Sequence, residues 1–215
     1  LNGNGSLFWA GGMRYGWAAN VIQKQFDYLF VYNDDCSFYS DAISRLLSTT
    51  HDYIKSYSNE LVTVVGSFRS SCDDSVNYGG QIRVGKIDPL KFRRVQPTEQ
   101  YQFVDTLNMN GALITSRSLE QIGFLASYFK HGGADFEFGL RLRRAGGRVI
   151  TAPGFIGECN RDIFKPNPNH NRSALRQIFE KKAFGAKISQ KESWRYYREH
   201  GGPIWALNWS LPLIL

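Results

Sequence analysis

Short apolar runs alternate with amphipathic stretches in the first part of the chain. Tyr28–Tyr32 is apolar or aromatic throughout and is followed by Asn33-Asp34-Asp35, a pattern typical of a buried strand that ends in a polar loop. Residues 15–25 carry apolar positions at helical spacing, and residues 61–65 predict a second buried strand that ends at Gly66. This order of helix and strand favours an α/β fold with a parallel sheet.

The segments that follow are shorter. Ser40 is positioned to cap a helix in which Ile43, Leu46 and Leu47 face inward. Alternation around Gly79-Gly80 predicts a hairpin over residues 76–84. We expect further strands at residues 92–95, Gln102–Val104, Gly111–Thr115 and 149–150, the last broken at Pro153, and helices at residues 118–122 and 135–145.

A turn-rich sequence, Pro166-Asn167-Pro168-Asn169, separates the last part of the chain. A helix is predicted at residues 173–184, and Ser189 with Glu192 forms a capping-box signature for another. We therefore predict an α/β domain over residues 1–165 and a helical extension over residues 166–215.

Positive charge is concentrated in the second half of the chain. The net charge is +7, from 26 Lys and Arg against 19 Asp and Glu, and residues 141–200 hold 14 of the former against 5 of the latter. Such a block binds anionic lipid headgroups, nucleic acid or a phosphorylated substrate, or it forms a solvated helix face.

The cysteines and the apolar runs exclude several classes of protein. Cys36, Cys72 and Cys159 form no Cys-x-x-Cys pair, so neither a disulfide framework nor a zinc knuckle is predicted, and a reducing compartment is the simplest interpretation. No apolar run reaches the roughly 20 residues of a membrane-spanning helix. The sequence signatures of serine hydrolases, zinc proteases and dinucleotide-binding folds are absent.

Two carboxylates and a carboxamide follow the first predicted strand, at the end where open α/β sheets bind ligands. Asp34, Asp35 and Asn33 offer hard oxygen ligands, which suit Mg²⁺ or Mn²⁺ bridging a diphosphate. Adjacent aspartates are also common in ordinary helix-entry turns, so it is the position after the strand that favours a cation site.

A second acidic pair begins the predicted helix 135–145. Asp135 and Glu137 follow Gly132-Gly133, so the Asp135 carboxylate can face a cleft beside a movable loop. A carboxyl group with an ordinary pKa of about 3.9 is ionised at neutral pH and can accept a proton. The alternative is that Asp135 only caps the helix and Glu137 only complements the helix dipole.

The glycine-rich start, residues 2–16, contains Arg14 among five glycines. Glycines permit close backbone approach to a phosphate that Arg14 can contact, although a plain loop has the same composition.

Five motifs occur in a characteristic order over residues 2–161. They are the arginine of the glycine-rich start, the strand ending in Asn-Asp-Asp, Asn110-Gly111-Ala112-Leu113-Ile114, Ile122-Gly123, and the run GGADFEFGLRLRRAG from Gly132 to Gly146. Together they resemble family 2 of the glycosyltransferases.

The resemblance implies a GT-A-like mixed sheet flanked by helices, and inverting transfer of a sugar from a nucleoside diphosphate sugar to a hydroxyl. By position, Asp135 matches the general base and Asp35 the ligand of a divalent cation, Mg²⁺ or Mn²⁺. The residues expected at the substrate are Arg14, Asn33, Asp34, Glu137, Arg141 and Arg144.

Two features depart from the family pattern. The family begins with a strand-helix-strand unit that grips the base and ribose, and the chain starts after its position, so we expect that unit to be missing. The family often has a histidine metal ligand shortly after the position of Pro153, where this chain offers Glu158 or Cys159 instead.

The resemblance further suggests synthesis of a bacterial surface polysaccharide such as O-antigen or capsule. The expected location is the cytoplasm, with the basic extension at the inner face of the plasma membrane beside a glycan or lipid-linked acceptor, and no nucleic-acid partner. Two alternatives remain open: a nucleotidyltransferase of similar fold, and a non-enzymatic basic module that binds nucleotide or lipid.

Overall fold

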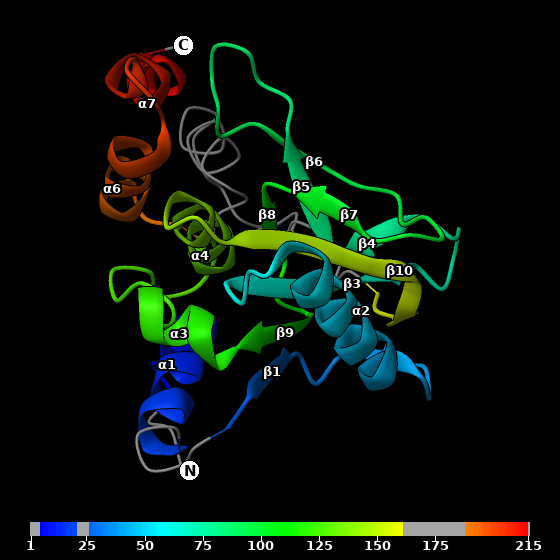
Figure 1. Cartoon of the computed structure of the whole chain (residues 1–215). Helices are drawn as coiled ribbons and strands as arrows, with labels where there is room; N and C mark the ends of the chain where they lie inside the picture. Colours follow the sequence, from blue (N-terminus) through cyan, green and yellow to red (C-terminus); the bar gives the residue numbers. More distant parts are fainter. Residues whose placement is uncertain (1–4, 21–25, 161–187, 215) are drawn as a thin grey trace.

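The structure is a computed structural model that describes residues 5–20, 26–160 and 188–214. A seven-stranded mixed sheet lies at its centre, and a smaller three-stranded sheet lies beside it (Figure 1). The large sheet has the spatial order β1 (Tyr28–Tyr32), β9 (Gly111–Thr115), β3 (Val62–Arg69), β10 (Arg148–Glu158) and β2 (Ser37–Phe38), with β4 (Val76–Tyr78) paired to β3 and β7 (Gln102–Val104) paired to β10. The small sheet is β6 (Phe92–Arg94), β5 (Gly80–Arg83) and β8 (Thr106–Leu107).

Strand direction brings several strand ends to one edge of the large sheet. β10 is parallel to β3, whereas β9 is antiparallel to both β1 and β3. β1, β3 and β10 therefore share one direction, so their carboxyl ends and the amino end of β9 lie at the same edge. The predicted mixed α/β sheet flanked by helices is confirmed, whereas the parallel sheet that the order of helix and strand favoured is not, because β9 runs antiparallel between β1 and β3.

Helices cover both faces of the sheet, and each face has its own core (Figure 1). The described helices are α1 (Phe8–Asn20), α2 (Ala42–Tyr57), α3 (Ser116–Ile122), α4 (Ala134–Arg144), α6 (Gln190–His200) and α7 (Trp205–Ile214). Leu46 and Tyr53 of α2 pack on Val64 and Ile150 on one face. The other core joins residues of α1, α3, α4 and α6 to alternate positions of the same strands, which explains why these strands are apolar throughout.

Two predicted strand ends are wrong. Gly66 lies inside β3, where a Cβ atom would stand 1.9 Å from Cδ1 of Ile156, so only glycine leaves room for that side chain. β10 continues past Pro153 to Glu158 through irregular pairing with β3 between Thr151 and Phe155. The guanidinium of Arg45 donates to the carbonyl oxygens of Pro153 (3.2 Å) and Phe155 (2.9 Å), which satisfies the backbone in that irregular stretch.

The predicted hairpin at residues 76–84 is also wrong. β4 pairs with β3, with Tyr78 opposite Phe68, whereas β5 pairs with β6 and β8 of the small sheet. The two strands are neighbours in sequence, but each has a partner distant in the chain, so their alternation does not indicate mutual pairing.

Helix predictions had mixed outcomes. The glycine-rich start is helical from Phe8, and Ile43 of α2 is 52% exposed because the buried stripe runs through Ala42, Leu46 and Tyr53 instead. The capping box of α6 is confirmed, since Ser189 Oγ accepts from Glu192 N and the Glu192 carboxylate accepts from Ser189 N. The helix predicted at residues 173–184, residues 21–25 of the first predicted helix and the turn at 166–169 lie outside the described residues. None of the described helices is long and apolar enough to cross a bilayer.

Candidate active site

A cleft of about 1200 Å³ lies at the edge where β1 ends and β9 begins. Its walls come from α1, the loop after β1, the segment around β4 to β6, the residues before β9, and the loop that leads into α4. The lining includes Asn33, Asp34, Asp35 and Asp135. Two acidic groups that are a hundred positions apart in the sequence thus face one cavity.

Asp135 is half-buried in the cleft wall and is held at both carboxylate oxygens. Oδ1 accepts from the backbone N of Phe136 at 2.9 Å, and Oδ2 accepts from Nδ2 of Asn108 at 3.4 Å. Gln81 Nε2 in turn donates to Oδ1 of Asn108 at 2.8 Å, which orients that amide. Burial raises the pKa of Asp135 to about 6, although these hydrogen bonds oppose the shift.

The loop before α4 brings Asp135 to the cleft. Gly133 has a φ of +85°, a left-handed conformation in which a side chain is strained. A Cβ at this position would also lie 2.7 Å from Cδ1 of Ile188 and 2.9 Å from the Phe129 ring. Glycine is therefore required where the chain turns into the helix.

The loop after β1 forms the facing acidic group. Asn33 N donates to the carbonyl oxygen of Asn110 at 3.3 Å, and Oδ1 of Asn33 accepts from Nε1 of Trp9 at 2.9 Å. Asp34 and Asp35 are exposed on the cleft wall. Asn33 is hydrogen-bonded both to α1 and to the residue directly before β9. These contacts fix the position of the backbone from which Asp34 and Asp35 extend.

Four other residues that we expected at the substrate do not line this cleft, and their side chains contact other parts of the protein. Arg14 donates to the carbonyl oxygens of Ala126 (3.0 Å) and Phe129 (2.8 Å), so it joins α1 to the loop before α4. Arg144 donates to the carbonyl oxygen of Glu199, at the end of α6.

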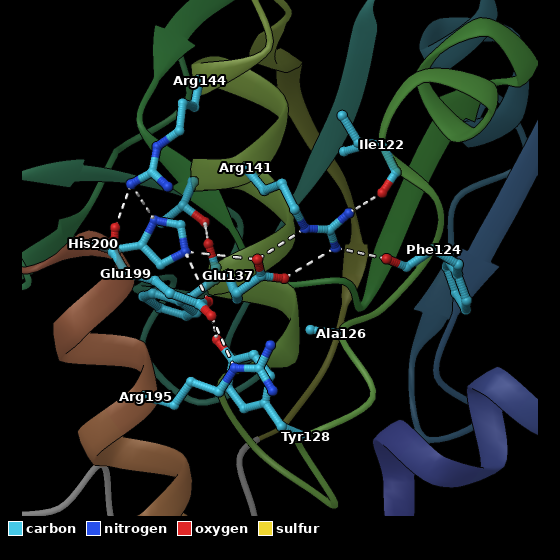
Figure 2. Close-up of polar contacts among 12 residues, drawn as sticks. Ile122, Phe124, Ala126, Tyr128, Glu137, Arg141, Arg144, Arg195, Glu199 and His200 are labelled. Carbon is cyan, nitrogen blue, oxygen red and sulfur yellow. Dashed lines mark hydrogen bonds and ion pairs between the residues drawn. The ribbon is translucent and has the colours of Figure 1, made fainter.

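Glu137 and Arg141 form a buried ion pair (Figure 2). Glu137 is 2% exposed, and its two carboxylate oxygens accept from Arg141 Nε at 2.8 Å and from Arg141 Nη2 at 3.0 Å. Arg141 also donates to the carbonyl oxygens of Ile122 and Phe124. Helical geometry explains why Glu137 is buried while Asp135 faces the cleft, because residues two positions apart in a helix point about 200° apart around its axis.

Sequence reasoning missed two cations and two amides that the fold adds to the cleft. Arg93 and Arg94 of β6 line it, and Arg94 Nη1 donates to the carbonyl oxygens of Val76 (2.6 Å) and Asn77 (3.0 Å). Gln81 and Asn108 also line it. An adjacent arginine pair at a strand was a visible signal for a phosphate-binding wall, but nothing in the sequence linked that strand to Asp34 and Asp135.

The donor atoms around Asp35 fit a divalent cation. Asp35, Cys36 and Cys159 each offer one ligand atom, and these atoms all lie within 4.8 Å of one another. Glu158, the other residue that we considered in place of the family's histidine ligand, instead forms an ion pair with Arg69, whose Nη2 lies 2.8 Å from Oε1 of Glu158. The carboxylate suits Mg²⁺ or Mn²⁺, whereas the two sulfur atoms do not.

Comparison with known proteins gives a match in structure only. No protein family profile matches the chain, and no curated sequence resembles it significantly. A crystal structure of GalNAc-T7 with UDP, GalNAc and Mn²⁺ superimposes with a TM-score of 0.50 and 12% identity. This chain has a GT-A-like fold.

The GT-A-like match is partial in length. It covers 68% of this chain but only 29% of the GalNAc-T7 chain. Apo UDP-glucose pyrophosphorylase matches over 70% of this chain and 52% of its own, at 12% identity and a TM-score of 0.35.

Proposed function

We propose that this protein transfers a sugar from a nucleoside diphosphate sugar to a hydroxyl acceptor, with inversion at the anomeric carbon. The observation that carries the proposal is that Asp34, Asp35 and Asp135 line one cleft of a GT-A-like fold. Transfer from a nucleoside diphosphate sugar gives each acidic group a task. One carboxylate can deprotonate the acceptor hydroxyl, and the other can hold a cation that offsets the charge of the diphosphate leaving group.

Asp135 acts as the general base in this proposal. With a pKa of about 6, its carboxylate is mostly ionised at neutral pH and is more basic than an ordinary aspartate. It takes the proton of the acceptor hydroxyl while that oxygen attacks the anomeric carbon. The bond between that carbon and the diphosphate oxygen breaks on the opposite face, which inverts the configuration.

The opposite wall of the cleft holds the donor. Arg93 and Arg94 offer positive charge to the diphosphate, and Asn33 and Asp34 face the nucleotide. Asp35 would hold the divalent cation, which, when bound, offsets negative charge that develops on the departing diphosphate.

A panel of nucleoside diphosphate sugars tests this function. We expect the full chain to release nucleoside diphosphate from at least one donor, in the presence of an acceptor and a divalent cation. Asp135→Asn should lower release by a factor on the order of 10² to 10⁴ while its circular dichroism spectrum stays unchanged, and Asp52→Asn, a change to an exposed carboxylate of α2, should have no effect. Pyrophosphate release from a nucleoside triphosphate would indicate a nucleotidyltransferase instead, and no release from any donor would indicate a binding module.

The cellular role is a finer part of the proposal. We place the enzyme in family 2, in synthesis of a bacterial surface polysaccharide on the cytoplasmic face of the membrane, with no nucleic-acid partner. The exposed apolar side chains of Ile204 (43% exposed), Leu207 (54% exposed) and Trp194 (37% exposed) support peripheral membrane contact by the C-terminal extension. Replacing Ile204 and Leu207 with serine should reduce sedimentation with anionic lipid vesicles, and unchanged sedimentation would remove this contact from the proposal.

A further inference from the structure

Two cysteines from distant parts of the chain meet beside Asp35. Cys36 follows Asp35 in the loop after β1, and Cys159 follows the last residue of β10. Because β1 and β10 run in the same direction, both cysteines lie at the same edge of the sheet. Asn110, directly before the antiparallel strand β9, lies there too.

Contacts with Asn110 and Asp35 hold the two sulfur atoms together. Nδ2 of Asn110 donates to the sulfur of Cys36 at 3.7 Å and to that of Cys159 at 3.8 Å. Both thiols also lie near Oδ1 of Asp35, which is 3.6 Å from Sγ of Cys36 and 3.8 Å from Sγ of Cys159. Two thiols and a carboxylate thus converge on one point.

The cluster is closed on one side and open on the other. Cys159 is 1% exposed and Cys36 is half-buried, whereas Asp35 is exposed on the cleft wall. A cation held by these three atoms would keep one coordination position facing the cleft. Three protein ligands with one open position is the usual arrangement of catalytic zinc sites.

The spacing suits a small tetrahedral ion. Sulfur ligands lie about 2.3 Å from zinc, so the ligand atoms of a tetrahedral site are about 3.5–3.8 Å apart. The three donor atoms are within 4.8 Å of one another, so closing around an ion requires a shift of about 1 Å at most.

We propose that Asp35, Cys36 and Cys159 form a site for a thiophilic divalent cation, such as Zn²⁺, in preference to Mg²⁺. Mg²⁺ requires oxygen ligands in octahedral geometry, and two of these three donors are sulfur. That a diphosphate oxygen occupies the open coordination position rests on the proposed function. The binding of the metal itself does not depend on that function.

Cobalt is the probe, because Co²⁺ replaces Zn²⁺ and its thiolate complexes absorb in the near ultraviolet. The full chain, reduced and freed of metal, is titrated with Co²⁺. We expect a sulfur-to-cobalt charge-transfer band that Zn²⁺ removes and a large excess of Mg²⁺ does not. Cys72→Ser, which removes an exposed thiol outside the cluster, is the matched control and should leave the band unchanged.

The cluster variants locate the site. Cys36→Ser and Cys159→Ser should each lower the charge-transfer intensity by about half and weaken Co²⁺ binding at least tenfold, since each removes one of two thiolates. Asp35→Asn should keep the band and weaken binding, which preserves the test if the buried Cys159 variant fails to fold.

The proposal is overturned if the wild-type chain shows no such band, or if the band persists unchanged in both Cys36→Ser and Cys159→Ser. The two proposals fail separately. A cobalt band without sugar transfer from any donor rejects the proposed function alone, and transfer supported by Mg²⁺ in a chain with no cobalt band rejects the thiophilic site alone.

Discussion

The chemistry of Asp135 is set by residues that are remote from it in sequence. Its position at a glycine-flanked helix start identified it as a candidate, but its burial and its contact with Asn108 come from the fold. Asn108 in turn is oriented by Gln81 of another strand. A sequence can therefore propose this carboxylate, but it cannot give the raised pKa that suits a base.

The raised pKa of Asp135 predicts how transfer depends on pH. Only the ionised carboxylate accepts a proton, so kcat/KM should rise with pH through about 6 and level off above it. Initial rates at saturating cation between pH 5 and 8 check this. A rate that is flat across this range would mean that Asp135 is not the base.

The raised pKa of Asp135 also predicts that stability falls as pH rises, in contrast to the activity. A carboxyl pKa that is higher in the folded chain means that ionisation favours unfolding, and this cost appears as pH rises from about 4 to 6. The wild-type chain should therefore lose about 2 kcal/mol of unfolding free energy between pH 4 and pH 8 that Asp135→Asn, which has no carboxyl group to ionise, does not lose. Urea unfolding at both pH values measures the difference, and a constant difference would contradict the shift.

At the scale of secondary-structure elements, helical phase separates the roles of Asp135 and Glu137. Both stand in the first turn of α4, and both were candidates from sequence. One faces the cleft, and the other faces the interior, where Arg141 reaches it from one turn later. The sequence contains this periodicity, but it does not say which face of the helix meets the cleft, because that depends on the docking of α4.

The turn into α4 gives a prediction about packing. Gly133→Ala should destabilise the chain more than Gly146→Ala, although the two glycines have similar φ values of +85° and +88°. A Cβ at Gly146 meets nothing within 4 Å, so that variant should cost only the backbone strain of about 1–2 kcal/mol. At Gly133 the clash with Ile188 and Phe129 should add about 1–3 kcal/mol.

Urea unfolding at neutral pH compares the two alanine variants. Equal losses of unfolding free energy would show that the loop before α4 is not packed as described, and that Asp135 is less firmly placed.

At the scale of the whole molecule, a buried polar network joins α6 to the helix that carries Asp135 (Figure 2). His200 Nε2 lies 3.6 Å from Oε1 of Glu137, and Tyr128 donates to Glu199 at 2.9 Å. Burial alone would raise the pKa of Glu137, but the close contact with His200 and the hydrogen bonds and charge of Arg141 outweigh it, so the pKa lies below its usual value. The network thus fixes the back of α4.

This network predicts a stability loss that depends on pH. Glu137→Gln should lower the unfolding free energy by about 1–3 kcal/mol at pH 7, because Arg141 loses its charged partner. A lowered carboxyl pKa stabilises the fold above the unfolded value of about 4.3, and this contribution is lost as pH falls through the folded value. The loss should therefore shrink towards pH 3.

Glu120→Gln is the control for Glu137→Gln, since Glu120 is an exposed ion-pair partner of Arg117 and should change stability by less than about 0.5 kcal/mol. Urea unfolding at pH 7 and pH 3 measures both variants. Equal effects of the two substitutions at pH 7 would contradict a buried network.

The sequence predicted the elements that are defined locally, and it failed where pairing is long-range. β1 and β9 match their apolar runs in extent, although β9 is buried in the sheet whereas β1 is its edge strand and only Val31 of β1 is fully buried. The hairpin at residues 76–84 failed because β4 and β5 pair with strands of different sheets. The proximity of Cys36 to Cys159, and of Asp34 to Asp135 in one cleft, likewise depends on the sheet topology, which the spacing of these residues in the sequence does not reveal.

The central claim is that the two acidic groups act on one bound sugar nucleotide. Donor binding by calorimetry and transfer rate, measured together in Asp135→Asn and Asp34→Asn, test it most directly. We expect Asp135→Asn to bind donor as wild type does and to lose transfer by a factor on the order of 10² to 10⁴, and Asp34→Asn to weaken donor binding. Wild-type transfer by Asp135→Asn, or wild-type donor affinity in Asp34→Asn, would contradict the account.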